Sequence, residues 1–249
     1  MVKTLFVDAS WEGEIRLSEE VLSFLREKNI QKIGLFASVQ FLKLDIVKKQ
    51  LEEEGILVLT TKAKRTDLPM QILGCDIYSD SYTNDIFSDA DLLVYVGDGL
   101  FHPKALLFSQ LEKKEQKDVL LWNPLSEKMS FLKSKDVLLE VKKRFSHLKK
   151  FILARKIGIL ITIKPGQQYF DLSLKLKNKL KKEGKECFIF LDNTFDYTHF
   201  ENYPFVDVWV NSACPRIGSD DLLHIRQPLI NIRDAFDAEK SLKELKRIL

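Results

Sequence analysis

The sequence predicts an α/β fold made of two tandem small three-layer α/β domains, each with a mainly parallel sheet of about four strands. Short apolar or β-branched runs alternate along the chain with amphipathic stretches of helical length, which is typical of βαβ units. The alternation restarts midway, where the KIGI of residues 156–159 echoes the KIGL of residues 32–35. A chain of 249 residues is long enough for two cores. We therefore expect domains at 31–150 and 151–249, after a short segment at 1–30.

The elements of the first domain follow from the apolar pattern and its terminators. Ser18 is placed to cap a helix, Gly55 to end one, and Pro103 suits a first helical turn. A strand at 3–7 and a helix at 18–28 precede the domain. Its expected elements are a strand at 32–37, a helix at 42–54, strands at 56–60 and 91–96, a helix near 103–111 and a strand at 118–122.

The second domain repeats this order after a charged helix at 135–150, which is expected to connect the two. Its lysine-rich stretch at 169–182 predicts a helix whose lysines either form a solvated face or contact an acidic partner. Leucines at helical spacing in 239–249 predict a helix that packs on the body or on another subunit. The other expected elements are strands at 156–163, 186–191 and 207–211.

Composition limits the class of protein. Apolar residues make up 45% and charged residues 30% of the chain, which is typical of an ordered globular protein. The net charge of +3 is small, so composition does not indicate direct nucleic-acid binding. Apolar runs are too short to cross a bilayer, and residues 1–9 lack a signal-peptide core, so we expect a cytoplasmic protein with no membrane contact. Three cysteines are an odd number in a chain large enough to fold without disulfides, which argues against a disulfide framework and leaves reduced thiols or metal ligands.

Candidate functional residues follow the carboxyl ends of predicted strands, where ligand-binding loops of parallel sheets gather. The strand at 91–96 leads into GDGLFHP at 97–103, and the strand at 207–211 leads into SACPR at 212–216. A long loop at 62–81 contains Gly74 and Cys75, and long loops in compact domains are often functional. Each feature also has a structural interpretation: a lone cysteine is usually a small buried side chain, and the histidine at 102 suits a helix start. Cys187, at the start of a strand, keeps that interpretation.

These segments together resemble one family. Gly74-Cys75, the segment at 89–103 that ends in GDGLFHP, and NSACPRI at 211–217 are similar to motifs of the 2-(3-amino-3-carboxypropyl)histidine synthases, the diphthamide synthase family. KPGQ at 164–167 is similar to another of its segments. The order and rough spacing of the motifs agree with the family, and the resemblance runs from about Gln31 to Arg233.

The resemblance implies a fold, a cofactor and a reaction. Family members carry three similar α/β domains around a pseudo-threefold centre, and each gives one cysteine to a 4Fe-4S cluster. The open fourth iron binds S-adenosyl-L-methionine, from which the reduced cluster generates a 3-amino-3-carboxypropyl radical that adds to a histidine of translation elongation factor 2. By this resemblance Cys75 corresponds to the second domain's ligand and Cys214 to the third's.

The sequence departs from the family pattern in one large respect. The first domain and its cysteine are missing, and only residues 1–30 are placed to be a remnant of it. Three explanations stay open: a separate chain supplies the domain, a partner subunit completes or replaces the site, or the cluster has been lost. We favour the first, a component of a split transferase. The alternatives are a non-catalytic accessory or electron-relay subunit, and, with weaker motif agreement, a quinolinate-synthase-like protein.

Further site residues are expected from the chemistry of an aminocarboxypropyl group, which carries a carboxylate and an ammonium. Arg216 is the candidate for the carboxylate, with a structural salt bridge as its alternative, and Gln167 and Gly97 are further cofactor-binding candidates. Asp98 and His102 are the candidates for positioning the cofactor or the target imidazole. Asp220 and Asp221 are expected either to take part in the site or to cap the following helix.

Overall fold

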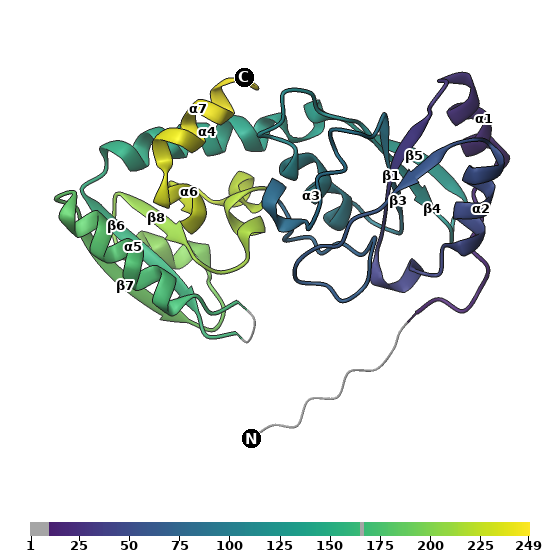
Figure 1. Ribbon diagram of the computed structural model, residues 1–249. Helices are drawn as coiled ribbons and strands as arrows, with labels where there is room; N and C mark the ends of the chain where they lie inside the picture. The colour runs from purple at the N-terminus through teal and green to yellow at the C-terminus, as the bar shows by residue number, and fades with distance from the viewer. Residues whose placement is uncertain (1–9, 165–166) are drawn as a thin grey trace. The chain divides into compact units, whose positions relative to one another are not determined.

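The computed structural model describes residues 10–164 and 167–249 and divides the chain into two compact units, Met1–Asp136 and Val137–Leu249 (Figure 1). Each unit is an α/β domain with its own, mainly parallel sheet, as the alternating sequence pattern predicts. The division falls before the long helix α4 (Leu138–Leu153), which thus belongs to the second unit. The strand expected at 3–7 lies outside the described residues. Within the described ranges, no helix is long and apolar enough to span a bilayer.

The sheet of the first unit has the strand order β2-β1-β3-β4-β5. The first four strands are parallel, and β5, which the sequence pattern does not predict, pairs antiparallel with β4 through a short turn. Ser18 caps the first helix as expected, because its Oγ accepts a hydrogen bond from the Val21 N–H. The elements are α1 (Glu19–Glu27), β1 (Lys32–Ala37), α2 (Asp45–Glu53), β2 (Leu57–Leu59), β3 (Leu92–Val96), α3 (Phe101–Ser109), β4 (Val119–Asn123) and β5 (Lys128–Leu132).

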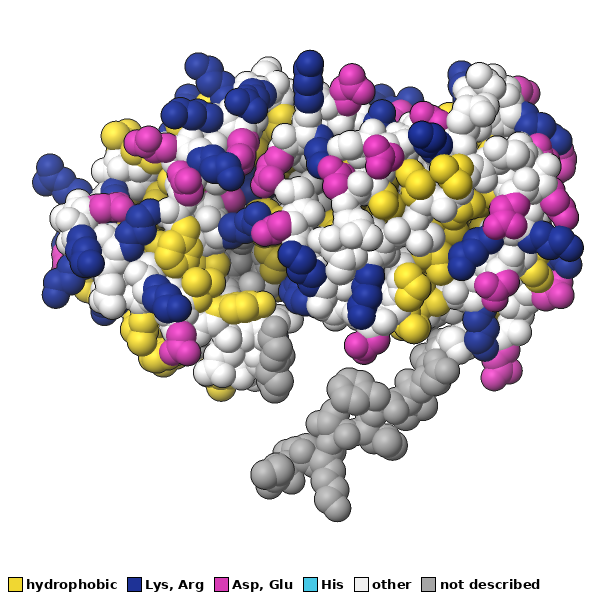
Figure 2. Space-filling model, viewed as in Figure 1, with side chains coloured by type: hydrophobic (Ala, Val, Ile, Leu, Met, Phe, Trp, Pro, Cys, Tyr) yellow, Lys and Arg dark blue, Asp and Glu magenta, His cyan; other side chains and the backbone are white. Residues whose placement is uncertain are grey.

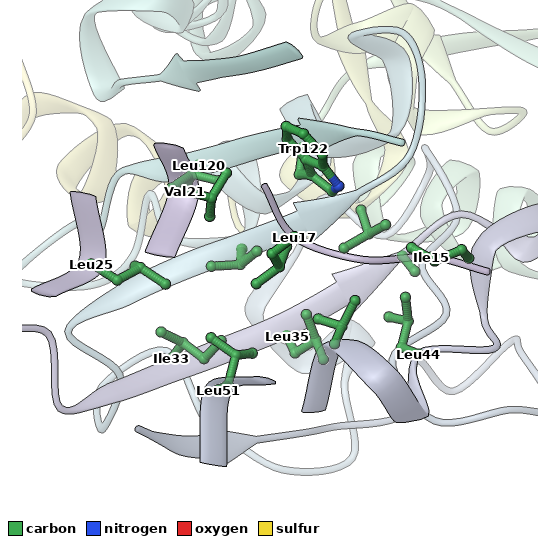
Figure 3. Packing of buried hydrophobic residues seen from close by; sticks show 14 of the residues in the cluster. Ile15, Leu17, Val21, Leu25, Ile33, Leu35, Leu44, Leu51, Leu120 and Trp122 are labelled. Atoms are coloured by element: carbon green, nitrogen blue, oxygen red, sulfur yellow. The ribbon is translucent and has the colours of Figure 1, made fainter. Parts of the chain in front are cut away.

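One core of the first unit lies between its sheet and the segments on either side of β1, residues 15–30 and 41–51 (Figure 3). Ile15 and Leu17 approach the sheet from the segment before α1, and the Trp122 indole N–H donates to the Arg16 carbonyl at 2.9 Å. The opposite face is aromatic, with Phe36, Tyr82 and Phe87 in mutual contact. Residues 15–30 are therefore an integral part of the first unit's core.

The sheet of the second unit has the order β7-β6-β8-β9, and all its strands are parallel. Helix α5 contacts β6 and β7, whereas the other face packs under an aromatic cluster in which Phe200 stacks on Trp209 at 4.2 Å between ring centroids. The C-terminal helix packs on α4, one of its two expected sites. The further elements are β6 (Lys156–Thr162), α5 (Phe170–Lys182), β7 (Glu186–Asp192), β8 (Val208–Asn211), β9 (Leu229–Asn231), α6 (Ile232–Phe236) and α7 (Ala238–Lys246).

The two units share local devices at corresponding positions. Asp91 accepts hydrogen bonds from the backbone N–H groups of residues 31 and 32, at 3.0 and 2.8 Å, just before β1. Asp207 accepts the equivalent pair from residues 155 and 156 before β6, at 2.9 and 2.8 Å. Gly34 and Gly158 face large side chains of the neighbouring strand, Leu93 and Trp209. The KIG repeat therefore marks equivalent strands of the two sheets.

Candidate functional site

The loop that carries Cys75 runs along the carboxyl end of β1. The Ala37 N–H donates to the Met70 carbonyl at 2.9 Å, and the Ile72 N–H donates to the Ala37 carbonyl at 3.2 Å. The chain therefore leaves the end of β1 only three residues before Cys75, which is half-buried. A thiol between β2 and β3 in the sequence is thus brought to the edge of the sheet where ligand-binding loops gather.

The GDGLFHP segment meets the Cys75 loop at the start of α3. A side chain at Gly74 would overlap the Phe101 ring, so glycine is needed for this close approach. The Phe101 and His102 rings lie edge to face at 5.5 Å, which places the half-buried His102 next to this contact. The structure therefore brings together two motifs that the sequence singled out separately.

A buried carboxylate fixes the backbone around Cys75. Asp76 is fully buried; its Oδ1 accepts from the Arg65 guanidinium at 2.9 Å and its Oδ2 from the Leu73 N–H at 2.8 Å. The same Arg65 nitrogen, Nη2, donates to the Cys75 carbonyl at 2.8 Å. Burial, followed by the nearby Asp76 carboxylate, raises the pKa of Tyr82, whose hydroxyl donates to the Asp76 carbonyl at 3.1 Å. Tyr82 therefore stays a neutral hydrogen-bond donor.

Gly97 and Asp98 follow β3 directly at the same edge. Gly97 is buried and its N–H donates to the Trp122 carbonyl at 3.0 Å, so its backbone continues the pairing of β3 with β4. Asp98 is exposed and lines an open crevice of about 710 Å³. The other described residues that line the crevice are Ser10, Trp11, Glu12, Gly13, Gln40, Phe41 and Leu125.

In the second unit Cys214 is the third residue after the end of β8, and a network of side-chain amides holds this turn. Asn211 Nδ2 donates to the Cys214 carbonyl at 2.9 Å and to Asn231 Oδ1 at 2.8 Å, while its Oδ1 accepts from the Ala213 N–H at 3.0 Å. Asn231 Nδ2 in turn donates to the Pro215 carbonyl at 2.8 Å. Both amides are almost fully buried, so the half-buried Cys214 sits on a rigid turn at the carboxyl edge of this sheet.

Arg216, the carboxylate-binding candidate, is 2% exposed and binds Asp220 within its own turn, with Nε donating to Oδ1 at 2.6 Å. Burial alone would raise the pKa of Asp220, but the hydrogen bonds and charge of Arg216 lower it overall. Burial and the neighbouring Asp220 charge raise the pKa of Asp221. Asp220 makes no capping hydrogen bond to the helical turn that follows, so the capping role expected for it is not seen. The geometry is that of the salt bridge named as the alternative for Arg216.

Gln167 and Cys187 are the two remaining residues that the sequence singled out. Gln167 is half-buried, and its N–H donates to the Lys164 carbonyl at 3.1 Å in the turn after β6. Cys187 pairs with Ile157 at the amino end of β7, opposite the edge that carries Cys214. Burial raises the pKa of the Cys187 thiol, which disfavours the thiolate that metal binding needs. The structural interpretation of Cys187 agrees with this geometry.

The donor chemistry of the two loops fits an iron-sulfur cluster in part. Thiolates are the usual protein ligands of iron-sulfur clusters, and each unit presents one half-buried cysteine on a hydrogen-bonded loop. Across the residues that the structure describes, no three His, Cys, Asp or Glu side chains gather into a metal-binding group. Two thiolates are fewer than the four ligands that such a cluster takes, so a cluster here would need ligands from outside the chain.

Comparison with known proteins defines the class. The model of the diphthamide synthesis protein family matches residues 1–246, and the chain belongs to this family. The 2-(3-amino-3-carboxypropyl)histidine synthase of Pyrococcus horikoshii is 29% identical over 77% of the chain and 52% of its own length. That of Methanocaldococcus jannaschii is 25% identical over 92% of the chain and 59% of its length. The chain thus spans between half and three fifths of these curated relatives.

A solved structure supports the same assignment. The crystal structure of Dph2 from Pyrococcus horikoshii with a 4Fe-4S cluster is 26% identical to the chain and superposes with a TM-score of 0.68. The match covers 90% of this chain and 61% of the Dph2 chain. The family resemblance and the α/β fold expected from the sequence are therefore confirmed.

Three contributors to the site had no role assigned to them from the sequence. Arg65 stood in the long loop without a function, and Asn231 is the last residue of β9, a strand that the apolar pattern missed. Asn211 is part of the NSACPRI motif, but nothing in the sequence assigns it a role of its own. Each of these side chains bonds to the backbone, a role for which residue type and spacing give little signal.

Proposed function

We propose that this chain is a component of a radical aminocarboxypropyl transferase that modifies a histidine of translation elongation factor 2 in the first step of diphthamide biosynthesis. In this proposal Cys75 and Cys214 bind a 4Fe-4S cluster, a separate chain supplies the missing thiolate and first domain, and S-adenosyl-L-methionine is the donor. The observation that carries it is that each unit holds a cysteine on a hydrogen-bonded loop at the carboxyl edge of its sheet, within a chain of this family.

Exposed apolar side chains support the requirement for a partner. Several large hydrophobic residues stand at least 44% exposed on the loops at the carboxyl edge of the first sheet and in the Cys75 loop, and Figure 2 shows apolar side chains between the charged ones on the surface. Such exposure is typical of surfaces that another polypeptide covers. The residues are Trp11, Val39, Leu68, Leu100, Phe101 and Leu125.

The chain's own residues bind and orient in this proposal. When bound, the reduced cluster supplies the electron that cleaves a carbon-sulfur bond of the donor. Asp98 is exposed and accepts the ammonium of the aminocarboxypropyl group. His102 is a hydrogen-bonding candidate for the cofactor or the target imidazole, and Gln167 is a neutral hydrogen-bonding candidate for the cofactor. Gly97 is buried and holds the turn that carries Asp98, and Arg216 binds the donor carboxylate only if Asp220 releases it.

The test is anaerobic reconstitution with ferrous iron and sulfide, of the chain alone and with a candidate first-domain protein, followed by iron analysis and electron paramagnetic resonance. Cys75→Ala and Cys214→Ala are expected to abolish most bound iron, whereas Cys187→Ala, the matched control, leaves it unchanged. Iron content that is insensitive to both ligand substitutions contradicts the proposal.

A second readout separates an enzyme from an accessory subunit. The reconstituted complex is incubated with labelled S-adenosyl-L-methionine and elongation factor 2, and label on the factor is measured. Transfer that depends on both cysteines supports the transferase. A stable, redox-active cluster without any transfer supports the electron-relay alternative instead.

A further inference from the structure

The backbone carbonyls of Cys75 and Cys214 have one property in common: each accepts a hydrogen bond from a side-chain N–H. Arg65 Nη2 donates to the Cys75 carbonyl at 2.8 Å, and Asn211 Nδ2 donates to the Cys214 carbonyl at 2.9 Å. Cys187, in contrast, lies within the ladder of β6 and β7, where backbone groups pair with each other. The two cysteines that the family motifs select are thus the ones with this side-chain contact.

In both loops the donor also ties the residues on either side of the cysteine. The Arg65 guanidinium binds Asp76, whose second oxygen accepts the Leu73 N–H, so the network spans residues 73–76. Asn211 accepts the Ala213 N–H before Cys214, and its partner Asn231 donates to the Pro215 carbonyl after it. Fixing the peptide groups on both sides of a residue fixes the direction of its Cα–Cβ bond, and so limits the thiol sulfur to the three staggered positions about that bond.

The two donors differ in chemistry and in origin, so a shared ancestral contact does not explain them. Arg65 is a charged, partly exposed side chain ten residues before its cysteine, whereas Asn211 is a buried neutral amide three residues before its own. What the two networks share is their acceptor, which in each case is the backbone carbonyl oxygen of the cysteine. Residues that orient metal ligands in this way commonly matter for metal affinity nearly as much as the ligands.

We propose that Arg65 and Asn211 are positioning residues for the cluster ligands Cys75 and Cys214: each holds its cysteine's carbonyl and thereby fixes the backbone from which the thiolate projects. The inference rests on the proposed function, because it takes both cysteines as ligands. It assigns to two residues outside the ligand set a direct influence on how firmly the cluster is held.

The experiment uses the full chain, reconstituted with ferrous iron and sulfide in the presence of dithiothreitol, which supplies thiolates that the chain lacks. The rate of iron release to a ferrous chelator and the electron paramagnetic resonance spectrum of the reduced cluster are measured. Asn211→Ala and the pair Arg65→Met/Asp76→Asn are expected to speed iron release about 10- to 100-fold and to change the spectrum. The second change in the pair keeps an oxygen for the Leu73 N–H without leaving a buried charge.

Matched controls remove a hydrogen bond from the same loops without touching a cysteine carbonyl. Ser212→Ala removes the bond from Ser212 Oγ to the Leu160 carbonyl at 2.7 Å, and Thr66→Val removes the bond from Thr66 Oγ1 to the Ala63 carbonyl at 2.9 Å. Both controls are expected to keep the parental release rate and spectrum. Arg65→Lys keeps a donor and a positive charge at this position. We expect its iron release to be slower than that of the Arg65→Met/Asp76→Asn variant and faster than that of the parent chain.

The outcomes separate this inference from the proposed function. If Cys75→Ala or Cys214→Ala retains the cluster, the proposed function has failed at that cysteine. If both abolish it, but the Asn211 and Arg65 variants release iron at the parental rate, or at the same rate as their matched controls, the positioning role is wrong. The melting temperature of each variant shows whether it keeps the fold. If the Arg65→Met/Asp76→Asn variant has lost the fold, the iron-release rates of Arg65→Lys and Thr66→Val decide the role of Arg65.

Discussion

In the first unit the cysteine comes from the loop between β2 and β3, whereas in the second it follows β8, the strand that pairs with β6 as β3 pairs with β1. The scaffolds correspond in strand order and in the Asp91 and Asp207 contacts, yet the thiols come from different connections. A parallel sheet brings the loops after all its strands to one edge, so either connection delivers a thiol there. The edge, and not the loop, is therefore what the two units keep in common.

The two loops also differ in charge. The Cys75 loop pairs one carboxylate, Asp76, with one arginine, Arg65. The Cys214 turn relies on neutral amides, and its Arg216 has two carboxylates nearby, Asp220 in direct contact and Asp221 beside it. The Cys75 loop is therefore held by an ion pair, and the Cys214 turn by buried neutral amides.

The largest expected effect tests whether the units are independent in stability. Asp234 on α6 binds Arg144 on α4, with both side chains at most 8% exposed and Oδ2 accepting from Nε at 3.0 Å. Asp234→Ala leaves the arginine buried without this carboxylate, so we expect a loss of about 3–5 kcal/mol in the unfolding free energy of the second unit. Hydrogen exchange read by mass spectrometry should rise in Val137–Leu249 and stay unchanged in the first unit. An equal rise in both units would show that they unfold together.

The glycines of the repeated KIG motif give a second comparison. A Cβ atom on Gly158 would lie 2.5 Å from the rigid Trp209 ring, whereas one on Gly34 would lie 2.8 Å from a terminal methyl of Leu93. A leucine methyl moves aside more easily than a buried indole, so we expect Gly158→Ala to cost about 1–3 kcal/mol and Gly34→Ala less. Thermal unfolding with residue-resolved exchange measures both. The two strands are equivalent if each variant destabilises only its own unit and the loss is larger for Gly158→Ala than for Gly34→Ala.

The strands of this motif show how far sequence alone reaches. The runs that became β1 and β6 each begin with a lysine and continue as an apolar segment, and their predicted positions agree with the structure almost residue for residue. By contrast, β5 has alternating exposed and half-buried residues, and β9 is only three residues long. Both are held by pairing with β4 and β8, which are tertiary contacts that a local pattern does not contain.

The candidate site divides in the same way. Motif residues such as Cys75 and Cys214 were found because loop position and residue type carry their signal. The roles of Arg65 and Asn231 were not found, since each acts on a backbone carbonyl reached only after folding. Arg216 was read as a ligand candidate because nothing in the sequence shows that Asp220 occupies its guanidinium.

A smaller effect is expected from the paired aspartates before β1 and β6. Asp91 and Asp207 are both exposed, and each accepts two backbone N–H groups. Asp91→Ala and Asp207→Ala should each cost their own unit about 1 kcal/mol, because water replaces part of the lost bonding. The bonds from residues 156 and 155 lower the pKa of Asp207, so its contribution is present above its ordinary pKa and is lost as pH falls through the lowered value. Unequal losses, measured by exchange in each unit at pH 7, would argue against equivalent roles.

The smallest expected effect concerns the surplus carboxylate of the Cys214 turn. Burial and the Asp220 charge raise the pKa of Asp221, so the folded state holds this proton more tightly than the unfolded state does. Stability from this group is therefore greatest at low pH and falls as pH rises through the ordinary and then the raised pKa. Asp221→Asn should stabilise the second unit at pH 7 by only about 0.3 kcal/mol, because the side chain is exposed and solvent screens it.

Denaturant unfolding at pH 7 and at acid pH measures the difference in unfolding free energy between Asp221→Asn and the parent chain. This difference should vanish in acid, where Asp221 is protonated. Asp220→Asn is the opposite control: it removes the partner of Arg216 and should destabilise at pH 7, and stabilisation by both substitutions would contradict the assigned imbalance of charge.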